Sequence, residues 1–196
     1  MLGQLPTTAD IAGKTYRIRT DYRVVLRIFA AISDPELTDK DKVLVCLANI
    51  YPDFMKIPDD DLPEAYEQAV KFIEAGGSRE KAGVRLMDWE KDEAIIFPAI
   101  NQAAGKEVRE LEHLHWWTFM GYFQSIDRDS LFSTVLMIRQ KKKKHKKLET
   151  WEQEFYNANR RLCDLKANDN NPAQSAEDSL KRIYEDLLKG GGQNGG

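Results

Sequence analysis

Apolar residues recur at helical spacing in nearly every segment after Asp21, and this period constrains the fold more than any other feature of the chain. The first stripe consists of Tyr22, Val25, Leu26 and Phe29. Asp21 precedes it and is suited to cap the helix. A strand pattern occurs only over Ile11–Ile18, where Gly13 suits a hairpin turn. We therefore predict a mainly α fold: a multi-helix globular domain with a small N-terminal β-hairpin and a C-terminal helical appendage.

Capping residues, prolines and glycines divide the rest of the chain into further helices. Thr38 and Asp41 resemble a capping box before the second helix. Later helices are expected after residues 58–61 as far as Gly76 and Gly77, from Asp88 to Gly105 with a kink at Pro98, and after residues 125–129. A heptad-like seam follows at Trp151, Phe155, Ala158, Leu162 and Leu165. Two heptads are too few to predict a coiled coil, so we expect this seam to dock on the core.

The segment 111–123 is rich in aromatic residues and is predicted to form a central helix. Helical spacing relates Trp116, Phe119, Met120 and Phe123. His113 and His115 are two positions apart, so on a helix they would point to opposite sides and could not bind one metal ion together. We instead expect each ring to find a carboxylate or carbonyl partner, and we predict no metal site.

Composition changes near the C-terminus suggest where the domain ends. We predict a helical domain over residues 1–166 and a polar linker over residues 167–174, where asparagine, aspartate and proline favour turns. A C-terminal amphipathic helix is expected over residues 175–189. The glycine-rich residues 190–196 should form a flexible tail.

The sequence contains no recognisable catalytic constellation. It lacks the glycine-rich phosphate loops and the nucleophile elbow, so we predict no catalytic residues, no cofactor and no enzymatic activity. Cys46 and Cys163 lie in apolar helical patterns and are expected to be buried free thiols. The acidic residues Asp88, Glu90, Asp92 and Glu93 are interpreted as favourable charges at a helix N-terminus. No apolar run is long enough for a membrane span, and no signal-like segment opens the chain, so a cytoplasmic location is expected.

A basic run is the strongest electrostatic feature of the chain. It consists of Arg139, Lys141, Lys142, Lys143, Lys144, Lys146 and Lys147. These seven charges leave the rest of the chain at −10, against a net charge of −3 for the whole. Neighbouring lysines repel one another, so the run does not serve local stability. It is predicted either to be solvated or to bind an acidic partner, and nucleic acid is less favoured because no aromatic residues are interleaved with the lysines.

Several ordered motifs resemble the "gene product 15" family of long-tailed bacteriophages and prophages. The motifs are Leu5–Thr8, Gly13–Arg23, Ser33–Thr38, Asp88–Ala104 and, most strongly, Leu114–Phe119. The core of the last motif is Leu114, His115, Trp116, Trp117 and Phe119. Together these motifs cover residues 5–165, and nothing in the resemblance assigns a role to the residues that follow.

The resemblance implies a helical tail morphogenesis protein of a phage or prophage, similar in role to tail assembly chaperones. Such a protein would bind the tape-measure protein, or other tail proteins, in the host cytoplasm during tail assembly, and it could also self-associate. The family has no catalytic residues to carry over and implies no cofactor.

Two alternatives remain open on the residues alone. A small nucleic-acid-binding or packaging accessory protein would explain the run over Lys141–Lys147, and its binding would depend steeply on salt. An enzyme with an unfamiliar histidine and acid site would explain His113 and His115, and it would show a bound metal or a shifted histidine pKa.

Overall fold

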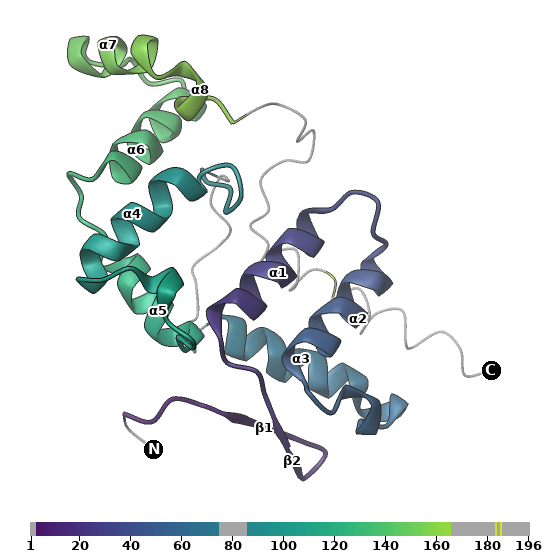
Figure 1. Ribbon diagram of the computed structural model, residues 1–196. Helices are drawn as coiled ribbons and strands as arrows, with labels where there is room; N and C mark the ends of the chain where they lie inside the picture. The colour runs from purple at the N-terminus through teal and green to yellow at the C-terminus, as the bar shows by residue number, and fades with distance from the viewer. Residues whose placement is uncertain (1–2, 75–85, 166–182, 184, 186–196) are drawn as a thin grey trace. The chain divides into compact units, whose positions relative to one another are not determined.

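A computed structural model describes residues 3–74, 86–165, 183 and 185 of the chain (Figure 1). The predicted linker, the glycine-rich tail and the glycine pair at Gly76 and Gly77 lie outside the described residues. The predicted C-terminal helix lies outside them too, apart from Ile183 and Glu185, which are both helical. The described residues are mainly α-helical with one two-stranded sheet, which confirms the predicted fold class.

The chain divides into two compact units that alternate along the sequence. Unit 1 contains Met1–Lys81, His113–Phe119 and Ser175–Gly196, and unit 2 contains Ala82–Glu112 and Met120–Gln174. Helix α5, Trp116–Gln124, begins in unit 1 and ends in unit 2.

Unit 1 consists of the hairpin and three helices. Its elements are β1 (Thr8–Ile11), β2 (Lys14–Arg17), α1 (Tyr22–Ser33), α2 (Asp39–Ile50) and α3 (Leu62–Ile73), with short 3₁₀ turns at Phe54–Lys56 and Asp59–Asp61. The strands are antiparallel, with Thr8 opposite Arg17 (Figure 1). Ala12 and Gly13 have φ of 48° and 74°, as a tight two-residue turn requires. The predicted turn at Gly13 is confirmed, although the first strand begins three residues earlier than predicted.

Local capping residues set the beginnings of α1 and α2. The Asp21 carboxylate accepts a hydrogen bond from the Arg23 amide, as the sequence predicts. Thr38 and Asp41 form the predicted capping box: the Asp41 amide donates to the Thr38 hydroxyl, and the Thr38 amide donates to the Asp41 carboxylate. Both caps satisfy amide groups that have no partner within the helix.

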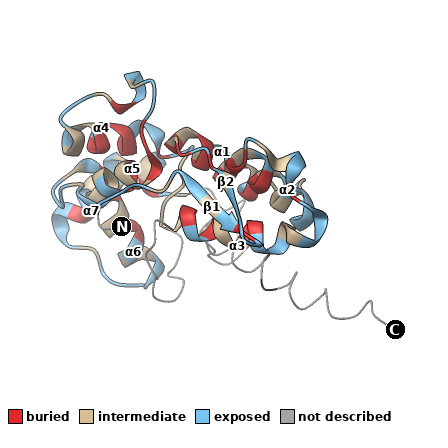
Figure 2. Ribbon diagram, turned by 90° about the horizontal axis from the view of Figure 1, so that it is seen from below, coloured by how far each residue is buried: buried red, intermediate tan, exposed pale blue. Residues whose placement is uncertain are grey.

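The core of unit 1 is aromatic. Its largest buried side chains are Tyr22, Tyr51, Tyr66, Trp116 and Phe119. The Tyr51 hydroxyl donates to the Ala65 carbonyl at 2.7 Å, so its polar end is satisfied inside the core. Figure 2 shows buried residues in red along α1 and α3.

Unit 2 contains the end of α5 and four further helices among the described residues. They are α4 (Glu93–Ala104), α6 (Leu131–Lys143), α7 (Thr150–Ala158) and α8 (Arg160–Cys163), with a 3₁₀ turn at Val108–Glu110. The predicted start of α4 at Asp88 is wrong, because the Asp88 carboxylate accepts from the Glu90 and Lys91 amides and closes a separate turn. Gly105, with φ of 67°, ends α4 as predicted.

The predicted heptad seam does not form one buried face. The helix is interrupted at Asn159, Trp151 is 48% exposed, and Ala158 is also exposed. The residues of α7 and α8 that are buried are Glu152 and Cys163. Glu152 faces inward because its carboxylate accepts from Lys141 and from the Glu149 amide. The expectation that the seam docks on the core is therefore only partly correct, because Phe155, Leu162 and Leu165 are half-buried whereas Trp151 and Ala158 are exposed.

Both cysteines are buried free thiols, as predicted, with Cys46 in unit 1 and Cys163 in unit 2. Burial raises the pKa of the Cys46 thiol to about 12. Burial also raises the pKa of Cys163.

Candidate functional site

The motif segment, residues 113–117, is extended up to His115, and α5 begins only at Trp116. The Tyr22 amide donates to the Leu114 carbonyl at 3.0 Å, and the Trp116 amide donates to the Thr20 carbonyl at 2.7 Å. This bridge pairs His115 with Asp21, and His113 lies outside any helix. The prediction that His113 and His115 lie on a helix is therefore wrong.

The two histidine rings bond to different groups. His115 Nδ1 accepts from the Trp117 amide at 3.1 Å, so Nε2 carries the proton and donates to the Pro6 carbonyl at 2.9 Å. His113 Nε2 lies 2.9 Å from the Thr20 hydroxyl. The expected carbonyl partner is confirmed for His115, whereas His113 pairs with a hydroxyl. Within the described part of the chain, no three His, Cys, Asp or Glu residues are grouped to hold a metal ion.

The two tryptophans of the motif close the end of α3. Trp116 Nε1 donates to the Ile73 carbonyl at 2.7 Å, and Trp117 Nε1 donates to the Phe72 carbonyl at 2.9 Å. Carbonyl groups in the last turn of a helix have no partner within the helix, so the indoles act as its C-terminal cap. The two adjacent indoles thus bond to two successive carbonyls at the end of α3.

The motif core is a packing centre and offers no open site. Phe119 stacks on Tyr22 with ring centroids 4.4 Å apart, and Trp116 meets Phe29 edge to face at 5.8 Å. Leu114, His115, Trp116 and Phe119 are all buried, and Trp117 is half-buried. The motif core therefore serves packing and is not an exposed binding surface.

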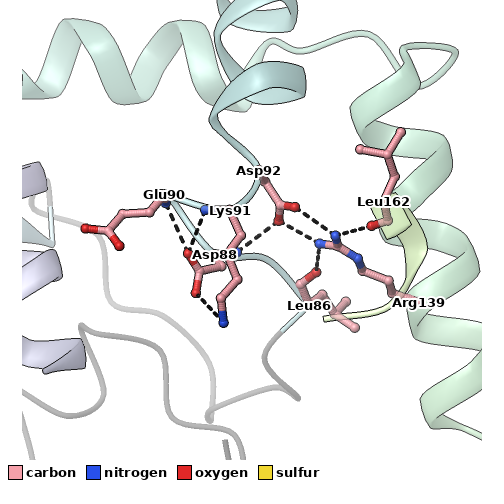
Figure 3. A network of polar contacts seen from close by, with 7 residues as sticks. All are labelled: Leu86, Asp88, Glu90, Lys91, Asp92, Arg139 and Leu162. Carbon is pink, nitrogen blue, oxygen red and sulfur yellow. Dashed lines mark hydrogen bonds and ion pairs between the residues drawn. The ribbon is translucent and has the colours of Figure 1, made fainter. Parts of the chain in front are cut away.

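Arg139, predicted to belong to the partner-binding basic run, is instead buried in unit 2. It is 4% exposed, and its two terminal nitrogens bond to the two Asp92 carboxylate oxygens at 2.6 and 2.7 Å. The same guanidinium donates to the carbonyls of Leu86 and Leu162 (Figure 3). This network joins the turn before α4 to α6 and α8, so Arg139 must be removed from the predicted surface.

Asp92 also differs from its predicted role as one of several charges at a helix N-terminus. It is 2% exposed and makes no side-chain bond to the amides of α4. Its carboxylate accepts instead from Arg139 and from the Asp88 amide (Figure 3). A buried carboxylate needs such partners, because desolvation without them is costly.

The first two lysines of the basic run are paired within unit 2. Lys141 donates to Glu152 at 2.5 Å, and this hydrogen bond lowers the pKa of the Glu152 carboxyl. Lys142 donates to Asp164 at 2.6 Å, and its Nζ lies 3.7 Å from the centre of the Tyr156 ring. Burial alone would lower the pKa of Lys142, but the bonds to Asp164 and Tyr156 raise it.

The lysines that follow are exposed. We call residues 143–147 the basic turn: it connects α6 to α7 and reverses direction at His145, whose φ is 52°. Lys144, Lys146 and Lys147 form no ion pair with any described residue. Three charges of the predicted binding run are thus available to a partner.

A groove of about 610 Å³ lies beside the basic turn. It is lined by Lys142, Lys146, Lys147, Leu148, Thr150, Gln153, Glu154 and Tyr156. We call it the α6–α7 groove. Its lining combines basic, acidic, apolar and aromatic side chains and contains no catalytic arrangement of the kinds named in the sequence analysis.

Comparison with known proteins identifies the family. Residues 1–165 match the family described as "Bacteriophage Gp15 protein". The chain belongs to this family. It matches no curated protein and no solved structure. The match to the Gp15 family includes both the motif segment and the basic turn, so both are parts of the shared domain of this phage protein.

Sequence reasoning missed the acidic and aromatic residues that complete the site in this Gp15 family member. Glu152 lies three residues after Glu149, and the two form a capping box that this spacing could have indicated. The contact of Tyr156 with Lys142 links residues fourteen positions apart and has no comparable signal.

None of the described helices is both long and apolar enough to cross a bilayer.

Proposed function

We propose that this phage protein is a tail assembly chaperone that binds the tape-measure protein and keeps it soluble until the tail tube forms. Membership of the Gp15 family supports a role in a phage. The observation that carries the binding role is the basic turn: Lys144, Lys146 and Lys147 are exposed, and Lys146 and Lys147 line the α6–α7 groove. The proposal is for a binding protein without catalytic activity.

This surface has the physical properties that such a chaperone requires. A long helical protein with exposed apolar seams associates with copies of itself. A chaperone must cover part of such a seam and still release it. The basic turn and the adjoining groove offer both charged and apolar groups. The charges attract a partner, and the apolar groups bury a moderate area on binding. This combination favours reversible binding.

Co-expression tests the proposal directly. The tape-measure protein of the same phage is produced with and without this chain, and its soluble fraction is measured. We expect higher solubility with the chain and a complex that survives size-exclusion chromatography. Equal solubility in both cultures, together with separate elution of the two proteins, would overturn the proposal.

A second candidate is a nucleic-acid-binding or packaging accessory protein, which the exposed lysines also favour. Two observations weigh against it: Lys141 and Lys142 are already paired with carboxylates, and Glu154 lines the groove. Retention on immobilised DNA at physiological salt, lost steeply as salt is raised, would favour this alternative.

A further inference from the structure

We infer that the α6–α7 groove binds an acidic amphipathic helix, whose carboxylates meet the basic turn and whose apolar face meets Tyr156 and Leu148. This inference rests on the proposed function and names the kind of segment that the partner presents. Three observations support it: the charge around the groove, the fixed position of the Tyr156 ring, and the presence of Glu154 in the lining.

The charge around the groove favours an acidic partner. Residues 131–165 contain nine basic and four acidic residues, a net charge of +5, whereas the rest of the chain carries −8. Two of the four acids, Glu152 and Asp164, are already paired with Lys141 and Lys142. The charges of Lys144, Lys146 and Lys147 are therefore not neutralised by these two acids, and they can accelerate the approach of an acidic segment.

The aromatic wall of the groove is already ordered. Tyr156 is held by Lys142, whose Nζ lies 3.7 Å from the ring centre, and its hydroxyl donates to Asp164 at 3.0 Å. Leu148 is half-buried beside it on the lining. Side chains that are fixed before binding lose little conformational entropy, so this apolar contact contributes more to affinity than a mobile one.

An acidic position in the groove favours a helix over nucleic acid. Glu154 lines the groove, and the Glu149 side chain, at the beginning of α7, is 69% exposed. A nucleic acid carries a phosphate at every step and would have to bring some of them near these carboxylates. A helix presents its side chains on distinct faces, so its carboxylates can face the lysines while neutral residues face Glu154.

The exposed Trp151 gives the site an intrinsic reporter. It follows the lining residue Thr150, it is 48% exposed, and its Nε1 donates to Glu149 at 3.0 Å. Of the four tryptophans, Trp116 is fully buried and Trp89 and Trp117 are half-buried, so Trp151 is the most sensitive to a ligand in the groove. A bound helix that shields Trp151 from water should shift its fluorescence to shorter wavelength.

The test uses a synthetic helical peptide with leucine at i, i+3, i+4 and i+7 and glutamate on the flanking positions. Its control carries lysine in place of glutamate. The protein variants are K144Q/K146Q/K147Q, which removes the three exposed charges, and K14Q/K40Q/K106Q, which removes three exposed lysines elsewhere. Both triple variants change the net charge by the same amount. Melting temperatures equal to that of the unmodified protein would establish that neither set of substitutions disturbs the fold.

We expect the acidic peptide to bind the unmodified protein and K14Q/K40Q/K106Q alike, and to bind K144Q/K146Q/K147Q about tenfold more weakly, as three exposed ion pairs would together give. The basic peptide should not bind. Equal affinity for the two triple variants would overturn the inference. Tighter binding of a single-stranded oligonucleotide than of the acidic peptide, at the same salt, would also overturn it in favour of nucleic acid.

Repeating the co-expression with both variants separates this inference from the proposed function. Loss of the tape-measure complex in K144Q/K146Q/K147Q alone would support both. A complex that persists equally in both variants would overturn the groove inference and leave the chaperone role intact. If the unmodified protein binds the acidic peptide through its lysines but never binds the tape-measure protein, the proposed function fails while the groove retains its specificity.

Discussion

The motif segment and the basic turn are equally conspicuous in the sequence, but their side chains are used in opposite ways. In the motif segment, the polar groups of His115, Trp116 and Trp117 bond to carbonyls and amides of unit 1. In the basic turn, Lys144 and Lys146 are exposed and make no ion pair with the described residues. An unusual cluster of residues therefore indicates a binding surface only where its polar groups are not already satisfied within the fold.

Because the motif segment packs in the core, we expect the largest loss of stability from a substitution of Trp116. Trp116→Ala should destabilise unit 1 by about 3 to 5 kcal/mol, because it opens a cavity in the core and leaves the Ile73 carbonyl without its donor. Denaturant unfolding measures the loss. Trp151→Ala is the matched control and should change stability by less than about 0.5 kcal/mol, since Trp151 is 48% exposed. Equal losses for the two variants would contradict the assignment of the motif as a packing centre.

Arg139 should be the one member of the predicted basic run that behaves like the motif segment. Arg139→Gln should cost about 3 kcal/mol, because it leaves the Asp92 carboxylate buried without its cation. Arg161→Gln, a change at an exposed arginine of the same unit, serves as the control and should be nearly neutral. Thermal unfolding distinguishes them. If Arg139→Gln leaves stability unchanged, the buried ion pair is contradicted and Arg139 belongs with the exposed charges of the basic run.

Lys141 should show an intermediate effect that depends on pH. The bond from Lys141 holds the pKa of Glu152 below its usual 4.5, so the folded state favours the ionised carboxylate. This stabilisation is present above the unfolded pKa and is lost as pH falls through the folded pKa. Lys141→Gln should therefore cost about 1 to 2 kcal/mol at pH 7 and less at pH 3. Stability curves against pH check this, and a loss that is independent of pH would contradict it.

The smallest effect on stability should come from the basic turn itself. K144Q/K146Q/K147Q should change the free energy of unfolding by less than about 0.5 kcal/mol, because these side chains are exposed and no described residue forms an ion pair with them. Calorimetry on this variant and on K14Q/K40Q/K106Q measures the difference. A marked loss of stability in the former alone would mean that the lysines belong to the fold, and would remove the contrast with the motif segment.

The features that local sequence could predict are those formed by neighbouring residues. The Asp21 cap, the Thr38 and Asp41 capping box, and the turns at Gly13 and Gly105 each depend on a few adjacent positions. They determine where α1 and α2 begin, where α4 ends and where the hairpin turns. For this reason the mainly α fold and its hairpin follow directly from pattern and propensity.

The predictions that were wrong concern contacts between distant residues. The late start of α5 depends on hydrogen bonds to Thr20 and Tyr22, and the burial of Arg139 depends on Asp92, 47 positions away. One signal for Arg139 was present: it lies four residues after Val135 and seven after Phe132, on the buried face of α6. No local sequence pattern indicates that Tyr156 lines the groove, because the packing of the helices is what brings its ring to Lys142.

The two buried thiols, one in each unit, allow the opening of the two units to be measured separately. Only the thiolate reacts with a maleimide, so Cys46 and Cys163 are protected while their units remain closed. The labelling rate of each cysteine then reports how often its own unit opens, and mass spectrometry counts the two events separately on one chain. A partner that binds unit 2 alone would slow the labelling of Cys163 and leave that of Cys46 unchanged.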